Sequence, residues 1–132
     1  MGPENHHSLS HEDLRNATVM KGLAAIDHWF AQQTALFVES LKTLREADGT
    51  SLLDNTLILY TSECADGDHS PNNMPIALFG GRSLGVQSGQ FLQYESRSFN
   101  DLWLAIAEAF EAPLTSLGEP EQSSGPLPGI FG

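Results

Sequence analysis

Apolar positions in the first third of the chain recur every three or four residues, the spacing of one helix face. Residues 14–47 hold many Ala, Leu, Gln, Glu and Lys and no proline, a composition that favours a helix. We therefore expect one long helix over this range, ended by a glycine cap at Asp48-Gly49. The buried face of this helix is expected to comprise Leu23, Ile26, Phe30, Phe37, Leu41 and Leu44, widened by Trp29, Leu36 and Val38.

The start of this helix has the form of a capping box. Ser10-His11-Glu12-Asp13 matches S-x-x-D, so the Ser10 hydroxyl is expected to accept a hydrogen bond from the Asp13 backbone amide. Gly22 weakens the early helix and predicts a bend or a break there.

Two short apolar segments predict strands. Thr56 to Thr61 is apolar almost throughout, which is typical of a strand covered on both faces in a parallel sheet. Met74 to Phe79 predicts a second strand, closed by Gly80-Gly81. Residues 90–94 alternate in polarity and form a candidate edge strand. The sequence therefore predicts an α/β fold.

The last third predicts one more helix and a tail. Residues 99–111 are amphipathic, with Ser98 as the expected cap and Pro113 as the stop. The inward residues of this helix are expected to be Leu102, Trp103, Ile106, Ala107 and Phe110. We divide the chain into a single α/β domain at 1–117 and a Gly/Pro/Ser-rich tail at 118–132, expected to be extended or partly disordered.

The net charge of the chain argues against two classes of binding partner. Seventeen acidic residues against six basic ones leave a net charge of −11. Nucleic acids and anionic membranes need clustered Lys and Arg, so neither is expected as a partner. No apolar run approaches the ~20 residues that span a bilayer. An acidic surface suits cation binding, although it also serves solubility alone. Cys64, the single cysteine, excludes an intrachain disulfide and a C-x-x-C metal motif.

Two polar clusters carry the candidate chemistry. His7 and His11 are four residues apart, with His7 expected in the loop that enters the long helix and His11 in the first turn. Their two nitrogens are able to converge on a zinc-sized ion, but histidines in a polar stretch are also often solvated and idle.

The second cluster follows the first predicted strand, where ligand sites of α/β sheets lie. Glu63, Asp66, Asp68 and His69 supply carboxylate and imidazole ligands suited to zinc, manganese or iron, and the extra carboxylates also admit calcium or magnesium. The alternative is an Asp-Gly-Asp turn in which the acids bond their own backbone.

These residues also carry a resemblance to a known family. His7-Ser8-Leu9-Ser10-His11-Glu12 resembles the motif that names the bacterial HXXSHH proteins, with Glu12 in place of the last histidine. The motifs that follow come in a similar order: a long helix, Asp48-Gly49-Thr50, Leu52 to Thr56, an apolar strand, Asp66-Gly67 with His69, then Asn-x-Pro and a strand ending in Gly-Gly. The resemblance spans most of residues 5–131. It implies the C-terminal part of a longer protein, secreted or periplasmic, whose N-terminal half would be a partner of this chain.

The HXXSHH family is similar in turn to the alkaline phosphatase-like superfamily of phosphatases, sulfatases and phosphomutases, whose sites usually hold two divalent metals. This likeness implies a partial alkaline phosphatase-like sheet with a long N-terminal helix and a second C-terminal helix. By position, His7 and His11 stand for an Asp-x-x-x-His pair and Glu63-Cys64 for an Asp-His pair, with Asp66 or His69 supplying the remaining ligands.

The expected metal ligands are thus His7, His11, Glu63, Asp66 and His69, with zinc expected first and manganese, calcium or magnesium as alternatives. In the superfamily the nucleophile comes from the N-terminal half, so these residues alone are expected to lack ester hydrolase activity. The rival interpretation is a non-enzymatic structural or interaction module. Exposed strand edges also make a homo-oligomer plausible.

Overall fold

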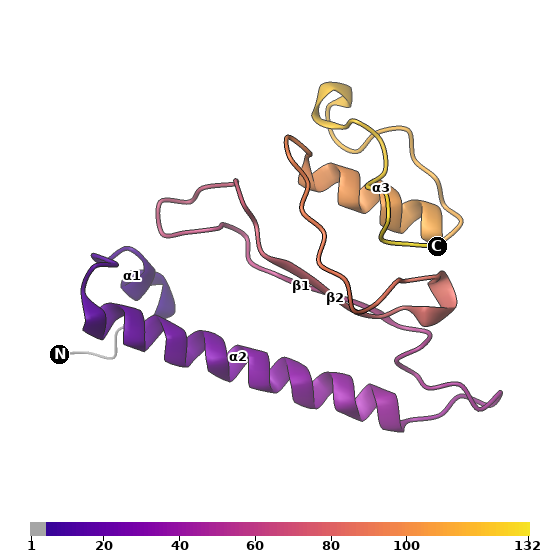
Figure 1. Cartoon of the computed structure of the whole chain (residues 1–132), viewed down its shortest axis with the longest axis horizontal. Coiled ribbons are helices and arrows are strands. Elements are labelled where there is room, and N and C mark those ends of the chain that lie inside the picture. The colour runs from indigo at the N-terminus through magenta and orange to yellow at the C-terminus, as the bar shows by residue number, and fades with distance from the viewer. Residues whose placement is uncertain (1–4) are drawn as a thin grey trace.

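The computed structural model describes residues 5–132, in which three α-helices accompany one pair of strands. The elements are α1 (His6–Ser10), α2 (Ala17–Thr43), β1 (Leu57–Thr61), β2 (Ile76–Gly80), α3 (Phe99–Ala109) and two 3-10 turns, η1 (Arg82–Leu84) and η2 (Pro120–Gln122). Figure 1 shows the strands running between α2 on one side and α3 with the C-terminal tail on the other. The chain is thus a mixed helix and strand structure, consistent with a loose α/β fold.

The long helix is confirmed, but it starts later and ends earlier than expected. Asn16 caps α2, because its side chain accepts a hydrogen bond from the Thr18 amide at 2.9 Å. At the other end Leu44 is already extended, with ψ at 141°. Gly22 lies within the unbroken helix. The Ser10 cap was wrong: Ser10 ends the separate helix α1, and its hydroxyl donates to the His7 carbonyl at 2.8 Å.

The strand pair is antiparallel, so the expectation of a parallel arrangement was wrong. Leu57 pairs with Gly80 and Thr61 with Ile76. Parallel strands need a crossover, usually through a helix. Here residues 62–75 form a loop that returns β2 beside β1 in the opposite direction.

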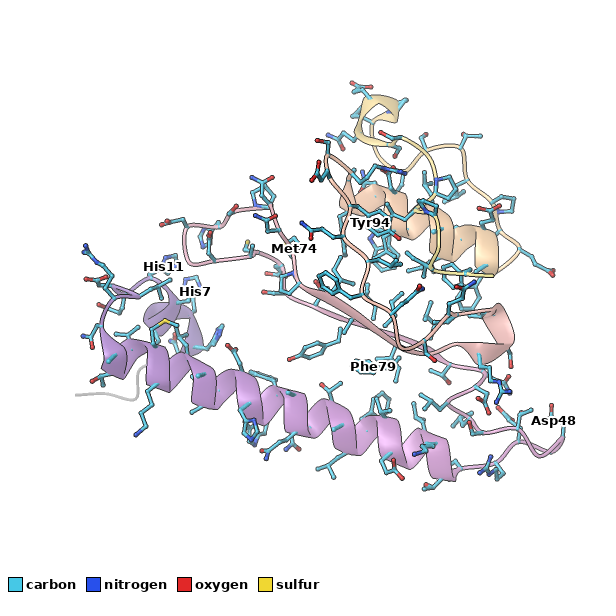
Figure 2. The ribbon with its side chains drawn as sticks, in the orientation of Figure 1. His7, His11, Asp48, Met74, Phe79 and Tyr94 are labelled. Carbon is cyan, nitrogen blue, oxygen red and sulfur yellow. The ribbon has the colours of Figure 1, made fainter. Side chains whose placement is uncertain are left out.

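Both faces of the strand pair are apolar, as the continuous pattern predicted. Ile58 lies opposite Phe79 on one face, and Leu59 lies opposite Leu78 on the other. Phe79 and Tyr60 line a groove of about 370 Å³ against α2, and Figure 2 shows Phe79 on the α2 side of the strands. The sheet therefore has apolar side chains toward each neighbouring layer.

The face that α2 turns to the sheet differs from the predicted one. The groove is lined from the helix by Ala31, Thr34, Ala35, Val38 and Glu39. Of the predicted apolar face, Leu41 is buried, whereas Phe30, Phe37 and Leu44 are about half exposed. Small side chains thus allow the helix to approach the strands, and most of the large apolar stripe remains in contact with solvent.

Helix α3 follows its prediction more closely. Ser98 caps it as expected, accepting a hydrogen bond from the Asn100 amide at 3.1 Å. Leu102 is fully buried, but Trp103 and Phe110 are exposed, while Leu104 and Ala105 are buried instead. The inward face is therefore rotated slightly from the predicted one.

The C-terminal tail packs against α3 and the segment before it. Ile130 is buried, and Leu127 donates its backbone N–H to the Asp101 carbonyl at 3.1 Å. The expected edge strand at 90–94 is irregular, and two of its side chains bond the tail: Gln90 Nε2 to the Gly129 carbonyl and the Tyr94 hydroxyl to the Pro128 carbonyl. These bonds across more than 30 residues hold the tail in place.

An ion pair between partly buried Arg97 and fully buried Asp101 joins α3 to this tail. Asp101 is fully buried, and its Oδ2 accepts from Arg97 Nε at 2.7 Å. Its Oδ1 accepts from the Ser124 amide at 2.7 Å, while Arg97 Nη2 donates to the Gly125 carbonyl at 2.7 Å. Burial raises the pKa of Asp101, but the hydrogen bonds from Arg97 and Ser124 outweigh it and leave that pKa below its ordinary value. We call this set of residues the Arg97–Asp101 clamp.

Across residues 5–132, no helix combines the length and the apolar character needed to cross a membrane.

Candidate metal centre

Three histidine side chains from two separate segments meet at one end of the molecule. The ring centroids of His7 and His11 are 4.7 Å apart, and those of His11 and His69 are 5.0 Å apart. The third side of this triangle, between His7 and His69, measures 6.3 Å. We call these residues the three-histidine cluster. The two polar segments that supply the expected ligands therefore lie side by side.

Helix α1 sets the spacing of the first two histidines. His7 lies within α1 and His11 is its C-cap, so residues four apart stand on one face of the short helix. Asn5 fixes the start of the helix by accepting from the Ser8 amide at 2.8 Å. His7 therefore lies in a helix rather than in an entering loop, and His11 ends α1 rather than beginning α2. Figure 2 shows the two histidines side by side on this helix.

The loop after β1 holds His69 in a tight turn built on Asp66. The Asp66 carboxylate accepts from the amides of Asp68 and Ser70 through the same oxygen, at 3.0 and 3.1 Å. The Asp66 carbonyl accepts from the His69 amide at 3.1 Å, and His69 itself has φ of 61°. Such side-chain bonds to the following backbone are the expected behaviour of Asp in a turn. The alternative interpretation of this segment, a turn in which an acidic side chain bonds its own backbone, is therefore correct for Asp66.

Gly67 brings the loop against α1. A Cβ at this position would lie 1.8 Å from the Ser10 carbonyl oxygen and 2.7 Å from its carbon. Since no real side chain tolerates such a separation from backbone atoms, only glycine allows the loop to approach the end of α1 this closely. This contact, between residues 57 positions apart, is what places His69 beside His7 and His11.

Helix α1 is itself anchored to α2. Leu9 is buried, and its Cδ2 lies 2.9 Å from where a Cβ on Gly22 would stand. Gly22 therefore accommodates the packing of α1 on the long helix. Figure 1 shows α1 lying against the N-terminal end of α2, with the 62–73 loop reaching toward it.

The separations within the cluster suit a tetrahedral metal. Imidazole nitrogens bind zinc at about 2.0–2.1 Å, which places the ring centroids about 3.2 Å from the metal and about 5 Å from one another. The observed separations of 4.7 and 5.0 Å agree, and 6.3 Å is longer by about one ångström. The ring donors are imidazole nitrogens, a donor type that zinc prefers, so the residue types and their spacing fit this metal.

The present arrangement of the side chains does not form a metal site. As they stand, residues 5–132 contain no group of three His, Cys, Asp or Glu side chains that would hold a metal ion. All three histidines of the cluster are exposed. Exposed side chains change rotamer within picoseconds to nanoseconds, so the rings are free to turn when a metal binds. Binding therefore requires side-chain rotation on a backbone that is already in place.

The carboxylates of the predicted ligand set make no ion pair with the histidines within residues 5–132. Glu63 and Asp66 are both exposed, and the four ion pairs within residues 5–132 involve neither of them. One Asp66 oxygen is committed to the turn, which leaves its second oxygen as a potential donor. Cys64 is a half-buried free thiol.

Sequence reasoning missed two further features, one beside the cluster and one at the opposite end of α2. His6 lies 3.8 Å from the Asp27 carboxylate, an exposed contact between α1 and α2. A groove of about 610 Å³ lies far from the histidines, beyond the other end of α2, and its lining includes Arg45, Asp48, Asp54 and Arg82. Hydrogen bonds from Thr50 lower the pKa of Asp48, and hydrogen bonds from Ser51 lower that of Asp54. Figure 2 shows how far Asp48 lies from His7 and His11.

Comparison of the chain with family models, with curated proteins and with solved structures found no match.

Proposed function

We propose that this chain binds one divalent metal ion, zinc most readily, through His7, His11 and His69. The observation that carries the proposal is the meeting of three imidazoles from two segments at centroid separations of 4.7, 5.0 and 6.3 Å. Manganese, calcium and magnesium are weaker candidates, because the close donors are imidazole nitrogens rather than carboxylate oxygens.

The protein residues divide the work of such a site between them. His7 and His11 supply two nitrogens from a capped helix, and His69 supplies the third from the Asp66 turn. Glu63 or the free oxygen of Asp66 is the fourth donor in the resemblance-based assignment. If only the three histidines bind, a tetrahedral zinc ion would keep its fourth position for water or substrate.

The resemblance to the HXXSHH and alkaline phosphatase-like proteins extends this proposal to a reaction class. Under this hypothesis the chain is the C-terminal portion of a metal-dependent phosphate- or sulfate-ester hydrolase. The whole hydrolase would be a secreted or periplasmic bacterial protein. A metal held by these residues would stabilise negative charge on the ester. The nucleophile belongs to the partner half, so the 132 residues alone are expected to leave p-nitrophenyl phosphate and p-nitrophenyl sulfate intact.

The rival proposal is a non-enzymatic interaction module. The half-exposed apolar stripe of α2 favours it, since such a surface often marks a protein interface. In that case the histidines need not bind metal at all, and titration with zinc separates the two proposals.

The test is calorimetric titration of metal-free protein with Zn²⁺, comparing wild type, His69→Ala and His28→Ala. We expect one equivalent in the wild type. We expect His69→Ala to lose more affinity than the about 10–100-fold that removal of an outer-shell partner costs. His28 is also exposed but lies outside the cluster, so His28→Ala is the matched control. Equal affinities for all three proteins, or no binding by any, would refute the proposal.

A further inference from the structure

The large apolar side chains on the exposed face of α2 are spaced symmetrically along the helix, on the side turned away from the strands of their own chain. These side chains of the apolar stripe, Trp29, Phe30, Leu36 and Phe37, are 54%, 48%, 66% and 52% exposed. They are placed evenly about Gln33: the first two precede it by four and three residues, and the last two follow it by three and four. The pattern therefore reads the same in both directions along the helix.

This stripe faces away from the strands. Successive residues of an α-helix are about 100° apart, so Gln33 lies roughly 150° from the centre of the face that Ala31, Thr34, Ala35 and Val38 turn toward β1 and β2. Figure 1 shows that side of α2 running along the outer edge of the molecule. Between residues 26 and 40, the part of the chain that the structure describes leaves this face accessible.

We propose that α2 pairs with α2 of a second copy of this chain, antiparallel, about a two-fold axis at Gln33. A two-fold axis perpendicular to the plane of the two helices places Phe30 against Phe37 of the other copy on one side. On the other side of that plane it places Trp29 against Leu36 of the other copy. An isologous contact requires such a self-complementary patch, and the even spacing about Gln33 provides it.

The neighbouring positions also fit this pairing. Ile26 and Ser40 lie near the centre line of the stripe, seven residues before and after Gln33, so Ile26 lies opposite Ser40 of the second copy. A large side chain thus meets a small one at both ends of the contact, which favours close packing of two helices. Beyond these positions α1 covers the stripe through the contact of Leu9 with Gly22, and the paired region ends there.

The area is that of a small but specific interface. A fully exposed aromatic side chain offers about 150–250 Å², so the four half-exposed side chains present roughly 450 Å² per copy. Two copies then bury about 900 Å² through these residues alone, and Ile26, Gln33 and Ser40 bring the total past the about 1,000 Å² expected of a biological interface. We therefore expect a reversible dimer whose population rises with concentration.

Sedimentation velocity between 1 and 200 μM tests the pairing, with a chelator present so that metal does not bridge chains. The wild type is expected to shift from monomer to dimer, and Phe37→Glu to remain monomeric over the whole range. Gln32→Glu adds the same charge about 100° away from Gln33 and is expected to dimerise like the wild type. A monomeric wild type, or equal behaviour of the two variants, would overturn the proposal and leave the stripe to a different polypeptide.

Disulfide cross-linking tests the direction of the helices independently. In a Cys64→Ser background, Gln33→Cys lies on the axis and is expected to cross-link under mild oxidation. Ser40 is seven residues from the axis, so Ser40→Cys is expected to stay reduced, because its two copies lie about 21 Å apart. Efficient cross-linking through Ser40→Cys would show parallel or random contact and would contradict the proposed pairing. Neither experiment depends on metal binding by the histidines.

Discussion

The Arg97–Asp101 clamp and the three-histidine cluster are both polar assemblies formed between distant segments, yet they differ in how far their groups are satisfied. In the clamp, both oxygens of a fully buried carboxylate accept hydrogen bonds. In the cluster, His11 lies edge to face with both His7 and His69, all three rings are exposed, and no side-chain hydrogen bond joins them within residues 5–132. A satisfied buried network stabilises the fold, whereas close imidazoles left open to solvent are available to a ligand.

The backbone around each assembly supports the same distinction. The tail is held to α3 and to Arg97 by main-chain and side-chain hydrogen bonds. The 62–73 loop is held to α1 through a glycine contact, and the turn on Asp66 orders the backbone without using the imidazoles. The polar groups of the clamp are therefore hydrogen-bonded within the fold, whereas the imidazoles of the cluster remain accessible to a ligand.

The largest effect is expected from breaking the clamp. Arg97→Ala leaves Asp101 buried without its partner, and removal of one member of a buried ion pair costs about 3–5 kcal/mol. We expect a corresponding loss in the free energy of unfolding, measured with urea. Arg15→Ala removes the exposed contact with Asp13 and is the control, expected to leave stability unchanged within error. Equal effects of the two variants would show that the clamp does not hold the tail.

A smaller effect is expected from acid. The pKa of Asp101 lies below its ordinary value in the folded chain, so the unfolded state binds the proton more readily. The ionised carboxylate therefore contributes stability above its unfolded pKa of about 3.9, and this contribution is lost as pH falls through the folded pKa. Urea unfolding between pH 6 and pH 2 should show stability falling with pH, with a shallower slope for Asp101→Asn. An unchanged slope in that variant would assign the acid sensitivity to other carboxylates.

Local sequence patterns correctly predicted those elements whose position depends on neighbouring residues. The Ser98 cap, the amphipathic helix α3 and the two apolar strands are confirmed to within a few residues. The start of α2 was misplaced because two caps compete: Asn16 begins the long helix, and Ser10 is used inside α1. The capping-box pattern alone does not distinguish these uses.

Interactions between distant residues were not predictable in the same way. Arg97 and Asp101 are four apart, but their tail partners lie more than 20 residues further on and contribute only backbone atoms. Because any residue type offers the same backbone groups, the sequence carries no signal for this contact. The antiparallel pairing and the rotated face of α2 also depend on how the layers pack together.

The expected ligand set joined His7 and His11 with His69, but the sequence left open whether the two segments meet. The contact that brings them together was not foreseen. Gly67 read as part of an Asp-Gly-Asp turn, whereas its role is the close approach to the Ser10 carbonyl. A glycine beside candidate ligands is therefore a sequence signal for a close approach between two backbone segments.

The most direct test is therefore the zinc affinity of Gly67→Ala, which keeps every proposed ligand and disturbs only the approach of the loop to α1. Calorimetric titration beside wild type and Asp68→Ala, an exposed neighbour in the same turn, gives the comparison. We expect Gly67→Ala to fold, as judged by circular dichroism, and to bind zinc at least about 10-fold more weakly, as loss of a supporting contact does in known metal sites. Unchanged affinity in Gly67→Ala would show that the three histidines do not act as one site.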